Sequence, residues 1–85
     1  MSEETELNDR LRKSARTLRA WNWMAAISTR QAEAVAILRD EARFLIKLGL
    51  EHPKHARKIG RLIVAYNRLI EAIELRMAHR QKAAA

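Results

Sequence analysis

This chain of 85 residues contains no cysteine, which excludes disulfide bonds and thiolate metal sites. A small domain without either is typical of a reducing compartment, so we expect a cytoplasmic protein. No apolar run approaches the roughly 20 residues that span a bilayer, and the acidic start of the chain does not fit a signal or transit peptide. The sequence also lacks a repeat, a glycine-rich phosphate loop and a nucleophile elbow.

Glycine and proline are scarce as well, with two copies and one copy, so few positions interrupt a helix. We expect a single helical domain over residues 1–85. A domain of this size buries only about 60–65% of the surface that its unfolded chain exposes, which leaves a thin margin of stability. Because self-association is a common remedy, we expect a homo-oligomer, most simply a homodimer.

The apolar residues change sides along the first half of the chain. The first helical face consists of Leu7, Leu11, Leu18, Trp21 and Ala25. The second, about half a turn away, consists of Ile27, Ala34, Leu38 and Leu45. One straight helix cannot bury both faces against one core. Either the helix breaks near Ser28, or its two halves pack on different partners.

Local signals predict helices over residues 5–26, 29–48 and 54–82, joined by a turn over residues 49–53. Ser28 and Gln31 have the spacing of a capping box at the start of the second helix. Gly49 stands where a left-handed C-cap ends that helix, and Pro53 follows at a distance typical of a proline between two helices. The predicted fold is therefore all-α, a three-helix bundle in which an N-terminal helix packs on a long helical hairpin.

The last helix has the most regular apolar pattern. Its core stripe alternates four and three residues apart and consists of Ile59, Ile63, Tyr66, Ile70, Ile73 and Met77, flanked by Leu62 and Leu69. Ala56, Gly60 and Val64 form a row beside that stripe. A glycine in a helix interior costs about 1 kcal/mol relative to alanine, and close approach of a second helix would justify it. We predict that this row mediates self-association, with isolated surface aliphatics as the alternative.

Basic residues exceed acidic ones by 17 to 10, a net charge of +7. Four of the acids lie in residues 1–9, which leaves a balance of +11 on the rest of the chain. Two stripes oppose the apolar faces and consist of Arg12, Arg16, Arg19 and Trp23 on the first helix, and of Arg57, Arg61 and Arg68 on the last. Such stripes bind an acidic protein surface or nucleic acid, and a tryptophan fills a partner's pocket or stacks on a base. The alternatives are a solvated face and, for Trp23, burial under another helix.

Signals for catalysis are weak. His52 and His55 flank Pro53 without a third metal ligand nearby. Asp40 and Glu41 are adjacent, so they point to different sides of a helix. We predict no catalytic residue, no metal and no other cofactor.

One part of the chain resembles a known enzyme family. The segment at residues 45–49, Leu-Ile-Lys-Leu-Gly, precedes a last helix that carries Glu74 and resembles the small all-helical chorismate mutases. The resemblance implies a site in which Glu74 and basic side chains of the first two helices grip a dianion. The stretch between Arg30 and Gly49 is shorter than in that family, and its second helix lacks the expected Arg-Glu pair.

Taken together, the residues predict a small, basic, non-catalytic regulatory or adaptor protein that self-associates and binds an acidic partner protein through a helical face. The first alternative is a bundle that binds RNA, or DNA without sequence preference, because the helix-turn-helix spacing around Gly49 fails. The second is an enzyme of the chorismate mutase type. Residues 10–27 have the composition of an interfacial membrane helix, but an anionic surface would repel the acidic start, so we do not expect a membrane partner.

Overall fold

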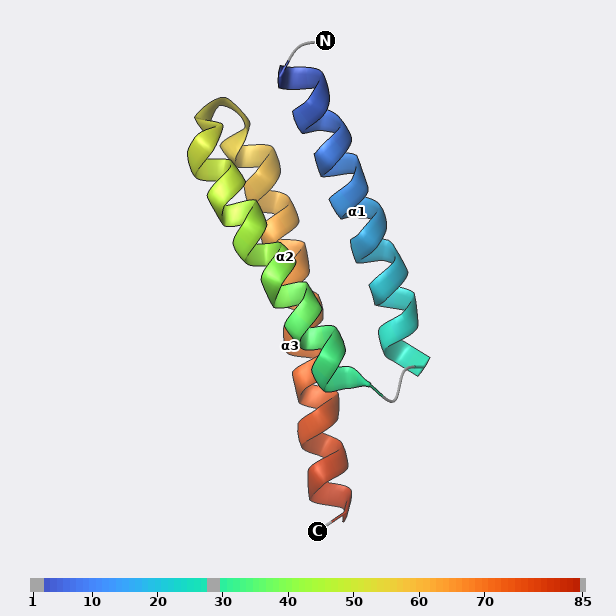
Figure 1. The fold of residues 1–85 in the computed structure, drawn as a ribbon. Helices are drawn as coiled ribbons and strands as arrows, with labels where there is room; N and C mark the ends of the chain where they lie inside the picture. Colours follow the sequence, from blue (N-terminus) through green and yellow to red (C-terminus); the bar gives the residue numbers. More distant parts are fainter. Residues whose placement is uncertain (1–2, 28–29, 85) are drawn as a thin grey trace.

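The structure is a computed structural model that describes residues 3–27 and 30–84, and this part of the chain forms three long helices and no strand (Figure 1). The elements are α1 (Glu3–Ile27), α2 (Gln31–Glu51), the short 3-10 helix η1 (Pro53–His55) and α3 (Ala56–Ala84). The prediction of an all-α fold with three helices is confirmed. The bundle is elongated, with extents of 54 × 19 × 15 Å.

The helix is interrupted between α1 and α2, where the apolar residues change sides. α2 begins at Gln31 rather than at the predicted residue 29, and Arg30 is its N-cap with a non-helical backbone (φ −97°, ψ 54°). Arg30 makes no side-chain capping hydrogen bond, but its carbonyl accepts one from the N–H of Ala34 at 3.1 Å. Ser28, the predicted capping residue, lies outside the described residues.

The turn between α2 and α3 differs from the prediction at Gly49. No glycine in the described part of the chain has a positive φ, and α2 continues past Gly49 to Glu51. The helix ends at His52, whose N–H donates to the carbonyl of Leu48 at 3.0 Å. The physical reason is Pro53, which disfavours a helical backbone at the preceding residue and begins η1. The predicted left-handed C-cap at Gly49 is therefore wrong.

The three helices lie side by side. α2 and α3 form an antiparallel hairpin, and α1 runs along it parallel to α3, which extends beyond the other two helices at its C-terminal end (Figure 1). The largest fully buried apolar side chains of the core are Leu38, Leu45, Ile59, Tyr66 and Ile73. From α1, Leu7 and Leu11 are buried, and Leu18 and Trp21 pack against the core from its edge.

Both predicted apolar faces point into this core. Ala34, Leu38 and Leu45 of α2 have no exposed surface, and the predicted stripe of α3 is buried or packed against the core along its length. The side chains of Ala25 and Ile27, which end the first face and begin the second, lie outside the described residues. None of the described helices is both long and apolar enough to cross a membrane.

Candidate functional site

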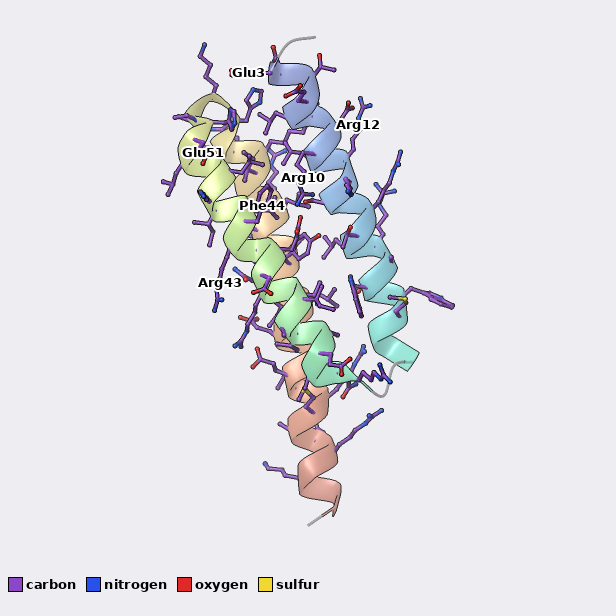
Figure 2. All side chains as sticks on the ribbon, in the orientation of Figure 1. Glu3, Arg10, Arg12, Arg43, Phe44 and Glu51 are labelled. Atoms are coloured by element: carbon purple, nitrogen blue, oxygen red, sulfur yellow. The ribbon has the colours of Figure 1, made fainter. Side chains whose placement is uncertain are left out.

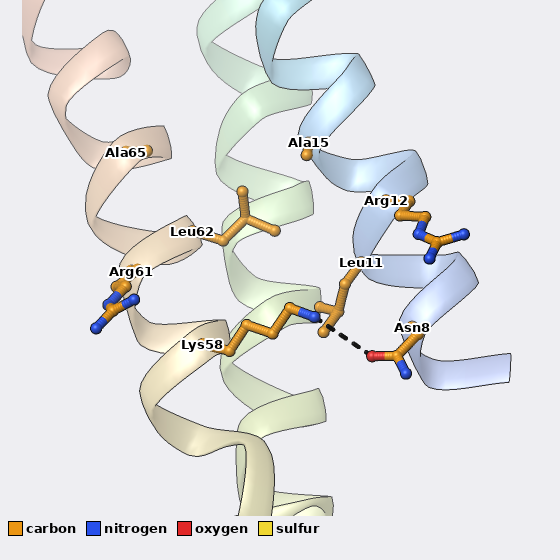
Figure 3. A pocket seen from close by; sticks show the side chains of 8 residues that line it. All are labelled: Asn8, Leu11, Arg12, Ala15, Lys58, Arg61, Leu62 and Ala65. Atoms are coloured by element: carbon orange, nitrogen blue, oxygen red, sulfur yellow. Dashed lines mark hydrogen bonds between the residues drawn. The ribbon is translucent and has the colours of Figure 1, made fainter. Parts of the chain in front are cut away.

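A groove runs between α1 and α3, with α2 behind it (Figure 3). It consists of two adjoining hollows of about 330 and 350 Å³ that share Ala65. The first is lined by Asn8, Leu11, Arg12, Ala15, Lys58, Arg61, Leu62 and Ala65. The second is lined by Leu18, Arg19, Asn22, Ala65, Arg68, Leu69 and Ala72. Because α1 and α3 run parallel, the hollows follow one another along both helices, and we call them together the α1/α3 groove.

The floor of the α1/α3 groove is apolar. Leu11 and Leu62 lie between the two helices, and the side chains of Ala15 and Ala65 add little bulk (Figure 3). The second hollow repeats this arrangement, since it pairs leucines of both helices with alanines of α3. Small side chains next to leucines leave a hollow that the bundle itself does not fill.

The rims of the groove are basic. They carry the side chains of Arg12 and Arg19 on α1, and of Lys58, Arg61 and Arg68 on α3. Among the residues that the structure describes, no carboxylate lines either hollow. In the same described ranges, Arg19, Arg61 and Arg68 have no ion-pair partner. At these three arginines the rims therefore present positive charge that no carboxylate of the described residues neutralises.

The end of the groove near the start of α3 is bridged by a polar contact. Lys58 reaches across from α3, and its Nζ donates a hydrogen bond to Oδ1 of Asn8 on α1 at 3.4 Å (Figure 3). Arg12 belongs to the same end and lies 3.9 Å from Asp9, an exposed pair between i and i+3. Exposed pairs of this kind contribute less than about 1 kcal/mol, so Arg12 stays available to a stronger acidic partner.

The structure brings together four of the seven predicted binding residues. Arg12, Arg19, Arg61 and Arg68 line the α1/α3 groove from its two sides. Arg16, Trp23 and Arg57 are exposed but do not line it. Trp23 is 71% exposed and lies one turn beyond Arg19, so the alternative of burial under another helix is wrong. Lys58 is a further rim residue, which the charge pattern of the sequence did not predict.

The predicted self-association row lies on a different surface. Ala56 and Val64 are exposed, and a Cβ built at Gly60 would meet no other atom within 4 Å. No described helix of this chain therefore approaches Gly60 closely enough to explain the glycine.

Exposed apolar residues of α2 share this surface. Arg39 on α2 and Glu74 on α3 form an ion pair at 3.0 Å whose side chains are about half exposed, so they mark a solvent-exposed side of the hairpin. Ile46 and Leu50 follow Arg39 at close to whole numbers of helical turns, and the Ala56/Gly60 row precedes Glu74 in the same way. We call the surface of Ile46, Leu50, Ala56, Gly60 and Val64 the open hairpin face.

A polar cluster inside the bundle holds α1 on the hairpin. Oε1 of Glu41 accepts hydrogen bonds from Arg10 Nη2 at 2.9 Å and from the hydroxyl of Ser14. The Ser14 hydroxyl also accepts from Arg10 Nη1 at 3.2 Å, and the Tyr66 hydroxyl donates to the Ser14 carbonyl at 2.6 Å. Arg10 also stacks on Phe44 between α1 and α2, with its Cζ 4.4 Å from the centroid of the ring (Figure 2). Three helices thus meet at one connected network.

The surroundings of Tyr66 in this network shift its pKa. Burial, together with the negative charge of Glu41, raises the pKa of Tyr66 to about 12. The phenol is therefore protonated near neutral pH and serves as a hydrogen-bond donor. The hydroxyl positions α1 against α3 and is not suited to accept a proton near neutral pH.

The residues weighed for catalysis or metal binding are separate from the groove. Glu74 accepts a hydrogen bond from Arg39 at an exposed position. His52 and His55 border a hollow at the end of the hairpin with Glu3, Glu4 and Glu51. Within the described ranges, no three His, Cys, Asp or Glu side chains lie close enough together to hold a metal ion.

Comparison of this chain with protein family models, with curated protein sequences and with solved structures finds no match.

Proposed function

We propose that this chain is a non-catalytic regulatory or adaptor protein that binds an acidic partner protein through the α1/α3 groove and self-associates through the open hairpin face. The observation that supports the first part is the opposition of two sets of cations across an apolar floor. Elsewhere in the bundle, Arg10 and Arg39 have carboxylate partners in Glu41 and Glu74. The rim arginines Arg19, Arg61 and Arg68 have none among the described residues, so an incoming carboxylate does not compete with an existing one.

The floor of the groove favours a protein over a nucleic acid. A phosphate backbone would neutralise the rims but would leave the partly exposed leucines of the groove, Leu18 and Leu62, in contact with water. Proteins that hold single-stranded nucleic acid place aromatic side chains under the bases, whereas the residues described in the lining of both hollows have aliphatic, amide or cationic side chains. An acidic protein surface with apolar residues at its centre uses both the floor and the rims.

A binding titration tests this proposal. Labelled polyglutamate, a short RNA and a short DNA duplex are titrated with the protein at about 50 mM salt, where exposed charges are weakly screened. We expect polyglutamate to bind and the affinity to fall as salt is added. Arg19→Glu with Arg68→Glu, which reverses both rims of the second hollow, should abolish this binding.

The matched control reverses the same amount of charge elsewhere. Arg43 and Lys47 are exposed on α2 and line neither hollow, and Arg43 points away from α1 (Figure 2). Arg43→Glu with Lys47→Glu should leave binding within about twofold of the unmodified protein. Equal losses in the two double variants would show a response to net charge alone. Binding of RNA or DNA without binding of polyglutamate would favour the nucleic-acid alternative.

Self-association rests on the exposed apolar residues of the open hairpin face. Ile46 and Leu50 are 49% and 79% exposed, and the open space at Gly60 lets a second helix approach the backbone of α3. A second copy supplies such a helix, and a two-fold dimer would bury this face on both subunits. We expect a dimer mass by light scattering at micromolar concentration, and a monomer mass would contradict self-association.

A variant pair locates the contact. Gly60→Leu should weaken association while helix content stays constant or rises, because leucine is the better helix former. Ala36→Leu adds the same side chain to an exposed position of α2 and should leave the mass unchanged. A dimer that survives Gly60→Leu would place the interface elsewhere.

A further inference from the structure

We infer that the α1/α3 groove takes a single amphipathic helix of the partner, with an apolar stripe on the floor and acidic residues along both edges, as the fourth helix of a bundle. The inference rests on the proposed function and specifies the shape of the acidic partner. It follows from the length of the groove, the size of its floor residues and the position of its charges.

The groove has the dimensions of a helix of about four turns. It runs from Asn8 to Asn22 on α1 and from Lys58 to Ala72 on α3. Each stretch covers 14 steps along its helix, or about 21 Å at 1.5 Å per residue. The equal lengths show that both helices frame the groove over its full extent, as two helices of a bundle frame a third.

The spacing of the lining residues supports the same conclusion. On α3 the residues at 58, 62, 65, 69 and 72 line the groove and alternate four and three apart. This is the repeat by which helices pack with side chains of one inserted between those of the other. It forms a second stripe on α3, next to the stripe that faces the core, so α3 has packing surfaces for more than one helix.

The small residues on the floor determine what the partner must supply. Ala15, Ala65 and Ala72 leave room, whereas the neighbouring leucines of the floor, Leu11 and Leu69, fill the space beneath them. A helix with large apolar side chains at the matching repeat fills the hollows at the density of a protein interior. Acidic residues on either side of that stripe then lie next to the arginines of the two rims.

A second copy of this chain fits the groove less well. The stripe of α2 that contains Ala34, Leu38 and Leu45 is already buried in the core. The exposed side of α2 carries Ile37 and Phe44, but the cations Arg43 and Lys47 stand beside them. A helix with uniformly acidic edges therefore belongs to another protein.

Two labelled peptides of about five turns test the inference. The first has leucines alternating three and four apart, glutamates on both flanks and alanines elsewhere. The second has the same composition in an order that destroys the apolar stripe. We expect the ordered peptide to bind at least about tenfold more tightly and to gain helical circular dichroism on binding.

Variants that fill the floor provide the second measurement. Ala65→Leu, at the residue shared by the two hollows, should weaken the ordered peptide about tenfold and leave polyglutamate binding unchanged. If Ala65→Leu alters the fold, Ala15→Leu fills the groove from the opposite helix and should weaken the peptide in the same way. Ala36→Leu, at an exposed position of α2, is the control. These variants keep every rim cation, so they separate shape from charge.

The outcomes distinguish this inference from the proposed function. The helix assignment would be overturned if the two peptides bound equally well, or if neither Ala65→Leu nor Ala15→Leu changed the affinity for the ordered peptide. The acidic-partner proposal would stand in either case. Failure of both peptides and of polyglutamate would overturn the two together. Loss of the dimer in Ala65→Leu, with no peptide binding to any form, would assign the groove to a second copy instead.

Discussion

The hydroxyl of Tyr66 on α3 donates a 2.6 Å hydrogen bond to the backbone carbonyl of Ser14 on α1. Tyr66 has no exposed surface, and Ser14 carries the hydroxyl that joins Glu41 of α2 to the same network. The contact lies level with the middle of the α1/α3 groove, since Ser14 precedes Ala15 and Tyr66 follows Ala65. It therefore fixes the rotation and register of α1 against α3, on which the opposition of the two arginine rims depends.

Removal of this hydroxyl should destabilise the bundle. Tyr66→Phe leaves a buried carbonyl without its donor from α3, and we expect a loss of about 1–2 kcal/mol in the free energy of unfolding, measured by urea denaturation. The control is Thr17→Val, which removes an exposed hydroxyl that bonds to the carbonyl of Lys13 in the same helix. Equal effects of the two substitutions would show that the Tyr66 contact has no special weight.

Alkaline pH should weaken the fold through the same residue. The pKa of Tyr66 is about 12 in the folded chain, because of burial and the nearby Glu41, against an ordinary value of 10.0. The unfolded chain therefore loses this proton first, so the contribution of Tyr66 is complete below pH 10 and is lost as the pH rises to about 12. Tyr66 is the only tyrosine, so its tyrosinate absorbance reports the pKa directly.

The comparison that isolates this effect uses Tyr66→Phe. Lysine side chains also titrate above pH 10, so the unmodified protein loses stability for more than one reason. In Tyr66→Phe the fall in stability over this range should be smaller. A tyrosinate midpoint near 10 in the folded protein would show that the phenol is not buried in the way described.

Substitution of Trp23 should separate binding from folding. Because Trp23 is 71% exposed, Trp23→Ala should change the free energy of unfolding by no more than about 0.5 kcal/mol. Trp21→Ala, at the edge of the core, should cost clearly more. Iodide should quench the fluorescence of the unmodified protein strongly and that of Trp23→Phe weakly.

Trp23 stands next to the arginine rim, so its loss should also reduce capture of the acidic helix. Complete loss of folding in Trp23→Ala would contradict its exposed position. Unchanged affinity with unchanged stability would exclude Trp23 from the binding surface and leave the groove itself unaffected.

Substitution of Gly60 on α3 should stabilise the fold, in contrast to the substitutions above. A Cβ at Gly60 has free space, and glycine costs helices about 1 kcal/mol relative to alanine, so Gly60→Ala should stabilise the monomer by about 0.5–1 kcal/mol. Gly49→Ala is the comparison, since its Cβ would lie 3.5 Å from Ile59, an ordinary contact. Thermal melts at dilute protein measure both. Destabilisation by Gly60→Ala under these conditions would mean that the monomer already packs against this glycine.

The helices and the core faces follow from the sequence because apolar periodicity is a local property. The repeat from Ile59 to Ile73 places the buried side of α3, and the change of sides near Ser28 predicts the break that separates α1 from α2. The end of α2 is a different case. A glycine four residues before a proline suggests a cap, but Pro53 alone ends the helix, and Gly49 keeps helical geometry.

The groove depends on how α1 docks, which periodicity does not determine. Each arginine stripe is visible in the sequence, but their opposition requires α1 to pack beside α3, as it does in Figure 1. One signal of that docking was present. Leu7, Leu11 and Leu18 lie at helical spacing with a polar residue, Ser14, where the next apolar one belongs, and Ser14 is the position that Tyr66 and Glu41 bind. A polar residue in an apolar stripe can indicate a buried network between helices.

The most direct test of the account is an amide chemical-shift map of the isotope-labelled protein with the ordered acidic peptide. We predict that the largest shifts fall on residues 8–22 and 58–72. The amides around Arg43 and Lys47, on the exposed side of α2, should stay unchanged. The shifts should disappear in Arg19→Glu with Arg68→Glu. Shifts that centre on α2 or on the open hairpin face, or a spectrum unchanged at saturating peptide, would contradict the assignment of the α1/α3 groove as the acidic-partner site.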